Sequence, residues 1–255
     1  MAKLKYERPI LIAHRGYSGR YPENTLLSYE AAYTYGARYM ELDLQMTSDS
    51  VPVLHHDVSL KRMAGVDLDV RNVTVDQFKE YRASYTERFG DEFNDNLFTT
   101  FKEFCRWLKQ NNDVTIFVEV KQESIEYFGL QVFMDEVYRN IIDENVEGQC
   151  VIISFNHLVV EYSRKISPMR VGWVLPKWEN NNHSKLKKLK PDFMFCDKNF
   201  LPNDDEDIWA GSWQWAIYNL DDVDSAIAMA NRGISFLETN QIGNLLADKR
   251  LSNRD

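Results

Sequence analysis

Three acidic residues in the chain have the types and spacing expected of a catalytic metal site. Glu41 and Asp43 are two positions apart, so in a strand both side chains leave the same face. Glu119 follows in a later apolar run, and no cysteine accompanies these acids. Three carboxylates form a hard, oxygen-rich ligand set. We therefore expect one divalent cation, Mg²⁺ or Ca²⁺, with Mn²⁺ also compatible.

Ion pairing is the alternative explanation for the same acids. A buried carboxylate needs a partner because an unpaired charge in an apolar strand is costly. Basic residues that could neutralise Glu41 and Asp43 are present in the sequence, namely Arg15, Arg38 and Lys121. For a single acid the sequence does not choose between the two explanations, whereas three acids together favour the cation.

Two histidines, His14 and His56, follow apolar runs in the same way. Imidazole titrates near neutral pH, so we expect this pair to transfer protons. His55 should point the opposite way in extended chain and should pack or face solvent. Asp57 could orient a histidine or cap a turn. Phosphate oxygens would be held by the planar fork of an arginine and the point charge of a lysine, here Arg15 and Lys121.

Composition limits the partners and the compartment. The 255 residues carry a formal net charge of −9, which argues against nucleic acid because backbone phosphates require a basic surface. The three cysteines are few and widely spaced, and we expect buried free thiols. The first residues, 1–9, lack the apolar segment of a signal peptide, and no apolar run is long enough to span a membrane. We expect a cytoplasmic protein, and the sequence does not indicate its oligomeric state.

Strand-like apolar runs alternate with helical patterns along most of the chain. Several runs are nearly continuous, which is typical of parallel strands buried on both faces. Helices are predicted over 24–35, from a capping box at Thr100 and Glu103 onwards, and over 222–232. The alternation indicates an α/β fold with a parallel sheet. The nine runs are 10–13, 39–44, 51–54, 114–120, 151–155, 170–175, 193–196, 213–218 and 234–237.

The third run does not fit a parallel sheet. Only the polar turn 47–50 separates it from the second run, and a parallel crossover needs about a dozen residues. Residues 51–54 should therefore return antiparallel, as a hairpin arm. The prediction is a single (β/α)8 TIM barrel over residues 1–255, with this arm and a small insertion at roughly 51–98. Active sites of such barrels form at the C-terminal strand ends, where the acids and histidines fall.

The same residues form an ordered set of motifs. They are His14-Arg15-Gly16, Pro22-Glu23-Asn24-Thr25, Glu41-x-Asp43, Thr47-x-Asp49, His56-Asp57 and Glu119-Val120-Lys121. This set resembles the glycerophosphodiester phosphodiesterase family. Ser154-Phe155 and Trp215 fall where that family has a Ser-Phe pair and a tryptophan-bearing strand. The resemblance thus extends from His14 to about Thr239.

The resemblance implies a TIM barrel that hydrolyses a small-molecule glycerophosphodiester to glycerol 3-phosphate and an alcohol. It implies metal ligands, an acid–base pair and phosphate contacts at the residues already singled out, and adds Asn24 and Trp215 to the substrate site. Two other functions stay open. The same site could act on lysophospholipids, as a lysophospholipase D with an apolar rim. The barrel could also bind phosphodiesters without catalysis.

The sequence offers no covalent nucleophile, and its last motifs depart from those of the family. Ser154 is not part of a Gly-x-Ser-x-Gly elbow, so the attacking oxygen should come from water or from the substrate's neighbouring hydroxyl, which we favour slightly. The family's final strands often read Trp-Thr-Val-Asn and Thr-Asp-x-Pro. Here Trp215 precedes Ala-Ile-Tyr, and the final motif is Glu238-Thr239-Asn240-Gln241. We expect these changes to affect the alcohol preference more than the chemistry.

Overall fold

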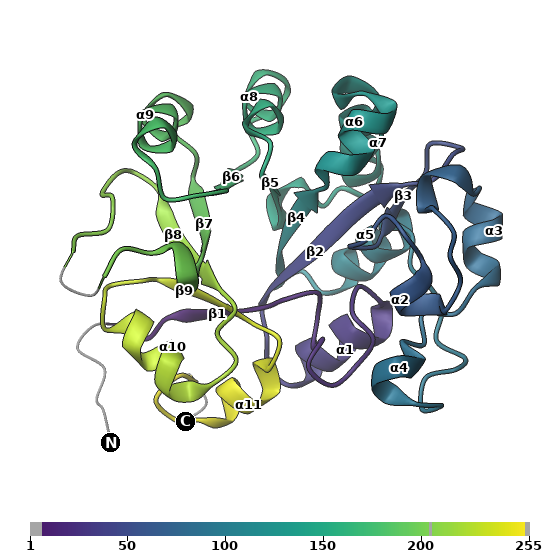
Figure 1. Ribbon diagram of the computed structural model, residues 1–255, viewed down its shortest axis with the longest axis horizontal. Coiled ribbons are helices and arrows are strands. Elements are labelled where there is room, and N and C mark those ends of the chain that lie inside the picture. Colours follow the sequence, from purple (N-terminus) through teal and green to yellow (C-terminus); the bar gives the residue numbers. More distant parts are fainter. Residues whose placement is uncertain (1–6, 204–205, 253–255) are drawn as a thin grey trace.

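Eight parallel strands close into a barrel in this computed structural model, which describes residues 7–203 and 206–252 (Figure 1). Strand β1 pairs with both β2 and β9, so the sheet has no open edge in the barrel. The predicted TIM barrel is confirmed. The strands are β1 (Ile10–Ala13), β2 (Tyr39–Met46), β4 (Thr115–Val120), β5 (Cys150–Ser154), β6 (Val171–Val174), β7 (Phe193–Asp197), β8 (Gln214–Tyr218) and β9 (Phe236–Thr239).

The ninth strand is the predicted hairpin arm. Strand β3 (Pro52–Leu54) runs antiparallel to β2, with Leu54 opposite Leu44. The turn between them is stabilised by Thr47, whose hydroxyl donates to Asp49 at 2.7 Å. The strands begin and end within two residues of the predicted runs, and β9 is displaced as a whole, to Phe236–Thr239 from the run 234–237. Because β9 ends at Thr239 rather than at residue 237, Glu238 is a strand residue.

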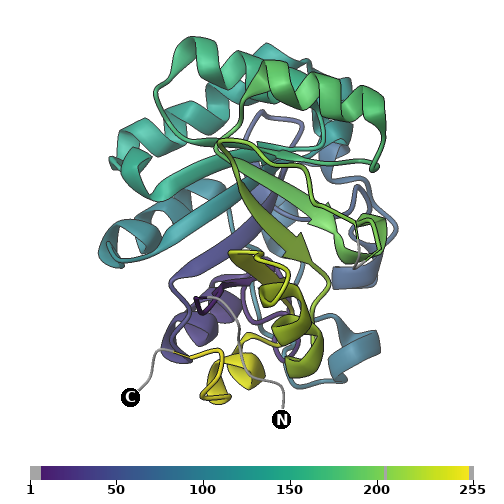
Figure 2. The same cartoon turned by 90° about the vertical axis from the view of Figure 1, so that its left-hand side faces the viewer.

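Helices lie on both sides of the tilted strands (Figure 2). The capping box predicted at Thr100 is present: the Thr100 hydroxyl accepts from the Glu103 amide at 3.2 Å. The barrel helices are α1 (Leu26–Thr34), α5 (Phe101–Gln110), α6 (Gln122–Phe128), α7 (Leu130–Glu144), α8 (His157–Ile166), α9 (Asn180–Leu189), α10 (Val223–Ala230) and α11 (Ile242–Ala247). Short 3-10 turns are η2 (Glu147–Gln149) and η3 (Lys198–Phe200).

The connection from β7 to β8 differs from the others, because its described residues contain η3 and no α-helix. Aromatic rings cover the outer wall there. Trp178 stacks on Trp209 with centroids 4.0 Å apart, and Trp215 of β8 lies 5.5 Å from Trp178. These rings bury apolar surface that a helix covers elsewhere in the barrel.

The insertion after β3 folds into a small unit beside the barrel, at the right of Figure 1. It contains α2 (Lys61–Ala64), η1 (Val70–Asn72), α3 (Val75–Glu80) and α4 (Thr86–Phe89). Its side chains form a separate apolar cluster around Phe78 and Phe98. His55 packs edge-on against both rings, at 6.2 and 5.6 Å, which confirms that it points away from its neighbour His56.

The barrel interior is filled with phenylalanine below the strand ends. The Phe117 ring lies 5.0 Å from both Phe193 and Phe195, in edge-to-face contacts. Cys105, Cys150 and Cys196 are buried free thiols, as expected. Among the described residues, no helix combines the length and apolar character needed to cross a membrane. Most of segment 1–9, on which the compartment was predicted, lies outside the described residues.

Candidate active site

A cavity of about 170 Å³ opens among the carboxyl ends of the strands, and most predicted site residues line it. One part of its wall is polar and contains His14, Arg15, Glu41, His56, Glu119, Lys121 and Glu238. The part contributed by β5 to β8 is mainly apolar and contains Ile153, Phe155, Val174, Phe195 and Tyr218. This arrangement agrees with the prediction from sequence that two histidines, two basic side chains and the acids converge.

A sharp turn after β1 directs His14 and Arg15 to the cavity. Arg15 and Gly16 have φ angles of 55° and 79°. A Cβ at Gly16 would collide with the first turn of α1, so only glycine fits there. The His14 amide donates to the Thr239 carbonyl of β9 at 3.0 Å. The Arg15 amide donates to Oε2 of Glu41 at 3.1 Å. The His-Arg-Gly motif thus specifies the sharp backbone turn that follows β1.

Asp43 is surrounded by positive and hydrogen-bonding partners. Its carboxylate lies 2.9 Å from Arg15 Nε and 2.7 Å from Lys121 Nζ, and it accepts from Asn24 Nδ2 at 2.9 Å. Burial opposes its ionisation, but Arg15 and Lys121 hold the pKa of Asp43 well below its ordinary value. The ion-pair alternative therefore describes Asp43 in this structure. Arg38, the third candidate cation, forms its ion pair elsewhere.

Glu41 lacks such compensation. The residue is 2% exposed, and its Oε1 atom has no hydrogen-bond partner. Burial and the charges of Asp43 and Glu238 raise the pKa of Glu41 well above its ordinary value. Ligand oxygens of Glu41, Asp43 and Glu119 all lie within 4.8 Å of one another. A buried, unpaired carboxylate oxygen beside two further carboxylates fits a hard divalent cation.

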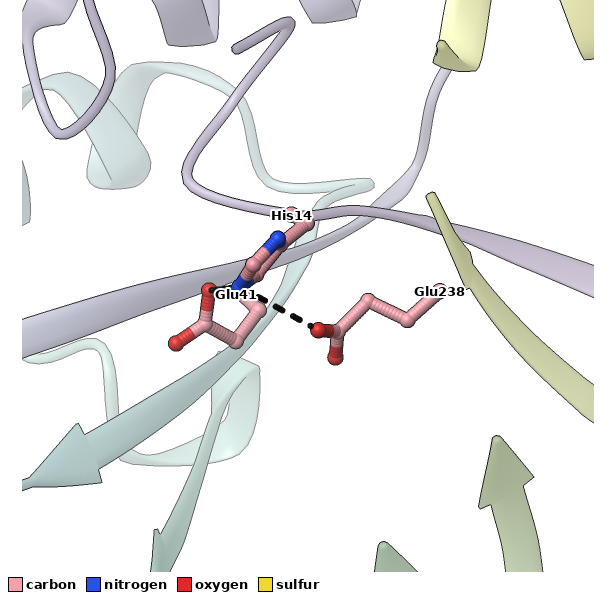
Figure 3. Close-up of side chains that lie close together, drawn as sticks. All are labelled: His14, Glu41 and Glu238. Carbon is pink, nitrogen blue, oxygen red and sulfur yellow. Dashed lines mark ion pairs between the residues drawn. The ribbon is translucent and has the colours of Figure 1, made fainter. Parts of the chain in front are cut away.

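Glu238 is a site residue that sequence reasoning did not single out. It is 4% exposed at the end of β9, and its Oε1 lies 3.5 Å from Nε2 of His14. His14, Glu41 and Glu238 come from three chain segments and point toward one another (Figure 3). Burial and the nearby Glu119 raise the pKa of Glu238 to about 8. The available signal was an acid two positions after Phe236, at the end of an apolar run.

His14 is held through one ring nitrogen and faces the acids with the other. Its Nδ1 lies 2.9 Å from Oδ1 of Asn240. Its Nε2 faces the acids, 3.9 Å from Glu41 and 3.5 Å from Glu238. Burial and the adjacent Arg15 lower the pKa of His14 to about 3. At neutral pH the ring is therefore uncharged and able to accept a proton.

His56 is held by a carboxylate instead. Its Nδ1 lies 2.6 Å from Asp57 Oδ1, and Asp57 Oδ2 accepts from Arg62 Nε at 2.7 Å. Arg62 also donates to Glu23 at 2.8 Å, and Glu23 accepts from Arg15 at 2.9 Å. This row of charges, from His56 to Arg15, crosses from the insertion to the barrel. Arg62 carries no recognisable sequence signal, because it lies in the insertion that the pattern did not place.

Two predicted substrate contacts require correction. Trp215 points away from the cavity, and its indole Nε1 donates to the Trp209 carbonyl at 2.9 Å. Strand alternation is the reason, since Ala216 and Tyr218 take the interior face of β8. Asn24 does not line the cavity either. Its side chain orients Asp43, so it supports the site from behind.

Comparison with known proteins agrees with this geometry. A model of the glycerophosphoryl diester phosphodiesterase family matches residues 14–201. The chain belongs to this family. The matched segment contains both histidines, the basic residues Arg15 and Lys121, and the three predicted metal ligands. Glu238 and Asn240 lie beyond it. The end of the barrel is therefore the part in which the family match gives the least guidance.

Individual relatives support the same assignment. A glycerophosphodiester phosphodiesterase from Caldanaerobacter subterraneus is 30% identical over 166 residues, which cover 65% of this chain and 66% of that protein. Mouse glycerophosphodiester phosphodiesterase 1 is 37% identical over 115 residues, 45% of this chain and 34% of that protein. The chain thus spans less than two thirds of these relatives.

A solved structure shows the same fold over most of the chain. A phosphodiesterase from Oleispira antarctica, in complex with the product sn-glycerol 3-phosphate, superposes with a TM-score of 0.82. The match covers 94% of this chain and 96% of that one, at 19% sequence identity. The family's barrel is therefore preserved here although most of the sequence differs.

Proposed function

We propose that this member of the family hydrolyses glycerophosphodiesters to glycerol 3-phosphate and an alcohol. The observation that carries the proposal is that two histidines, the basic side chains of Arg15 and Lys121, and a cluster of acids meet in one cavity. Phosphodiester cleavage needs this combination, because charge develops on phosphoryl oxygens while protons leave one oxygen and reach another. The names of the Caldanaerobacter and mouse relatives, and the product bound to the Oleispira enzyme, support this substrate class.

In this proposal Glu41, Asp43 and Glu119 hold one divalent cation, Mg²⁺ or Ca²⁺. When bound, the cation supplies Lewis-acid charge at the phosphate and its neighbouring hydroxyl. Arg15 and Lys121 line the same cavity and bind phosphoryl oxygens. The unpaired oxygen of Glu41 is the feature that favours a cation over a closed set of ion pairs.

His14 and His56 move the protons. The uncharged His14 accepts the proton of the attacking hydroxyl through Nε2, the nitrogen that faces the cavity acids. His56 gives a proton to the departing alcohol. Its Nδ1 contacts Asp57, which fixes the orientation of the ring for this transfer. Each histidine then returns to its starting state through the reverse transfer.

The attacking oxygen is the substrate's own hydroxyl, on the carbon next to the phosphate ester. A new P–O bond forms as the bond to the alcohol breaks, which gives a cyclic phosphate and the free alcohol. Water then opens the ring to glycerol 3-phosphate. Attack from the neighbouring carbon is effectively intramolecular, so it avoids much of the entropic cost of bringing two molecules together.

A second candidate is lysophospholipase D activity at the same site. Phe155 favours it, because this side chain lines the cavity and is 41% exposed. It places apolar surface where an acyl chain could lie. Glycerophosphocholine and lysophosphatidylcholine share a head group and differ by the acyl chain. A kcat/KM that is higher for the lysophospholipid would favour the second candidate.

The deciding experiment measures release of glycerol 3-phosphate from glycerophosphocholine, before and after exhaustive chelation. We expect turnover to vanish with the metal and to return with Mg²⁺ or Ca²⁺. A diester in which hydrogen replaces the neighbouring hydroxyl should bind but hardly react. Cleavage of that analogue at the parental rate would assign the attack to water. The absence of phosphodiester cleavage under all these conditions would contradict the proposed function.

A further inference from the structure

Asn240 presents its carbonyl oxygen to His14, and its surroundings determine that orientation. Asn240 Nδ2 donates to Asp221 Oδ2 at 2.9 Å. Asn240 Oδ1 accepts from the Ser18 hydroxyl at 2.8 Å and lies 2.9 Å from His14 Nδ1. A carboxylate only accepts hydrogen bonds, so the amide nitrogen has to face Asp221. The flipped amide would place two acceptor oxygens against each other.

Backbone contacts fix the positions of these groups. The Asp221 carboxylate also accepts from the Asn240 amide at 2.8 Å and from the Thr239 hydroxyl at 3.0 Å. The Asn240 carbonyl accepts from the Gly19 amide at 2.8 Å. Asn240 is thereby held between the loop after β1 and the loop after β8. Its side chain has little freedom to present its other face to His14.

The tautomer of His14 follows from this orientation. An amide oxygen accepts and cannot donate, so the nitrogen that faces it has to carry the proton. That nitrogen is Nδ1. The lone pair of the neutral ring then lies on Nε2, the nitrogen on the side of Glu41 and Glu238. Proton acceptance from a substrate requires a lone pair on this side.

We propose that Asp221 and Asn240 are positioning residues that hold His14 in the Nδ1–H tautomer, with Nε2 free to accept a proton in the cavity. Asp221 acts through the amide and does not touch the histidine. The meaning of this arrangement for catalysis rests on the proposed function. The tautomer itself does not, because it can be read without substrate.

The test reads the ring nitrogens of His14 by ¹⁵N NMR at pH 7, in the full-length protein labelled with ¹⁵N-histidine and with Mg²⁺ present. His14→Gln identifies the signals among those of the five histidines. We expect a protonated Nδ1 and an unprotonated Nε2. A protonated Nε2, alone or together with Nδ1, would overturn the proposal.

Asp221→Asn is the decisive variant. It places an amide nitrogen against Asn240 Nδ2, so Asn240 flips and turns its own nitrogen toward His14. We expect the proton to move to Nε2 and kcat to fall by about 10- to 100-fold, part of the contribution of a general base. KM should change little, because Asp221 does not line the cavity. An unchanged tautomer in this variant would reduce Asp221 to a purely structural residue.

The exchanged pair distinguishes orientation from folding damage. In Asp221→Asn/Asn240→Asp, the new amide at 221 can donate to the carboxylate at 240, which again accepts from His14. The Nδ1–H tautomer and much of the rate should return. Asp197→Asn is the matched control, because Asp197 accepts from Asn219 at 2.7 Å in a similar Asp–Asn pair, whereas His14 Nδ1 contacts Asn240. It should leave the His14 tautomer unchanged. Failure of the exchanged pair to restore the tautomer would also contradict the proposal.

Discussion

The two histidines of the cavity lie in regions with opposite charge balance. On the β1–β9 side, His14 faces Glu41 and Glu238. Within the described residues, neither acid has a lysine or arginine side chain in ion-pair contact. On the β3 side, Asp57 beside His56 forms an ion pair with Arg62, which is also paired with Glu23. The β1–β9 side therefore holds excess negative charge, whereas the carboxylates on the β3 side are neutralised by neighbouring arginine side chains.

This difference separates what the protein chain provides from what it leaves for a ligand. The β3 side needs no added ion, because each of its carboxylates contacts a guanidinium. The β1–β9 side can lower its free energy in only two ways, by binding protons or by binding a cation. We therefore expect substitutions on the two sides to respond differently to metal and to pH.

The largest expected effects are on turnover. His14→Ala and His56→Ala should each reduce kcat by about 100- to 10,000-fold, the range for a general acid or base. Steady-state assays on glycerophosphocholine measure this, and circular dichroism checks the fold. A His56→Ala enzyme with near-normal turnover would remove that side of the cavity from the chemistry.

His55→Ala is the control for both variants. His55 packs against Phe78 and Phe98 in the insertion, so its loss should lower the free energy of unfolding by about 1 to 3 kcal/mol. Turnover per folded molecule should stay close to that of the parent. The comparison separates an adjacent buried histidine from one at the cavity.

The next effect distinguishes the two strand acids. Asp43→Asn leaves Arg15 and Lys121 without their shared carboxylate and should destabilise the metal-free protein by about 3 kcal/mol. Glu41→Gln replaces a carboxyl group whose ionised form is disfavoured by burial and by Asp43, so in the absence of metal it should be neutral or stabilising. Both variants should weaken Mg²⁺ binding in calorimetry. Equal destabilisation by the two substitutions would mean that Glu41 is as well paired as Asp43.

The barrel and the core of the site could be predicted from sequence for a physical reason. Parallel strands buried on both faces leave nearly continuous apolar runs, and Glu41, Asp43 and Glu119 interrupt such runs inside β2 and near the end of β4. The alternation of side chains along each strand then puts Glu41 and Asp43 on one face. The substrate contact predicted for Trp215 was wrong because the position of a residue in a motif does not show which face of the strand it occupies. On β8 the cavity face belongs to Tyr218.

The residues that sequence reasoning missed act through long-range contacts. Arg62 joins Asp57 to Glu23, 39 positions away, and no local pattern encodes such a contact. We expected the change to Asn240 near the C-terminus to affect the alcohol preference. The structure places Asn240 against the His14 ring, 226 positions away in the sequence, which is the basis for proposing that it positions His14; the effect on alcohol preference stays a prediction.

A smaller effect is expected where the two regions meet, at Arg62. Arg62→Gln should leave both partners, Asp57 and Glu23, without their shared cation and loosen the placement of His56. We expect kcat to fall about 10-fold, at the low end for groups that orient a functional residue. Arg71→Gln is the matched control, since Arg71 lies in the same insertion but pairs with Asp69, whereas Arg62 pairs with the Asp57 carboxylate beside His56. Equal losses in the two variants would assign Arg62 to folding alone.

The smallest effect is a difference in the pH dependence of stability, with opposite sign on the two sides. Burial and Glu119 raise the pKa of Glu238 to about 8. A raised carboxyl pKa contributes stability that is present at acid pH and is lost as pH rises toward 8. Arg15 and Arg62 outweigh burial and lower the pKa of Glu23 to about 2. Its contribution is present at neutral pH and is lost as pH falls toward 2.

Glu238→Gln and Glu23→Gln test this difference in metal-free buffer by urea denaturation. Relative to the parent, Glu238→Gln should gain about 1 kcal/mol of stability per pH unit between pH 5 and 8. Glu23→Gln should be less stable than the parent at pH 6, and its deficit should shrink below pH 4 because the parent then loses the same charge. Saturating Mg²⁺ should flatten the first curve and leave the second unchanged, because a cation among the acids favours ionised Glu238. The same pH slope for both variants would mean that the two sides do not differ in charge balance.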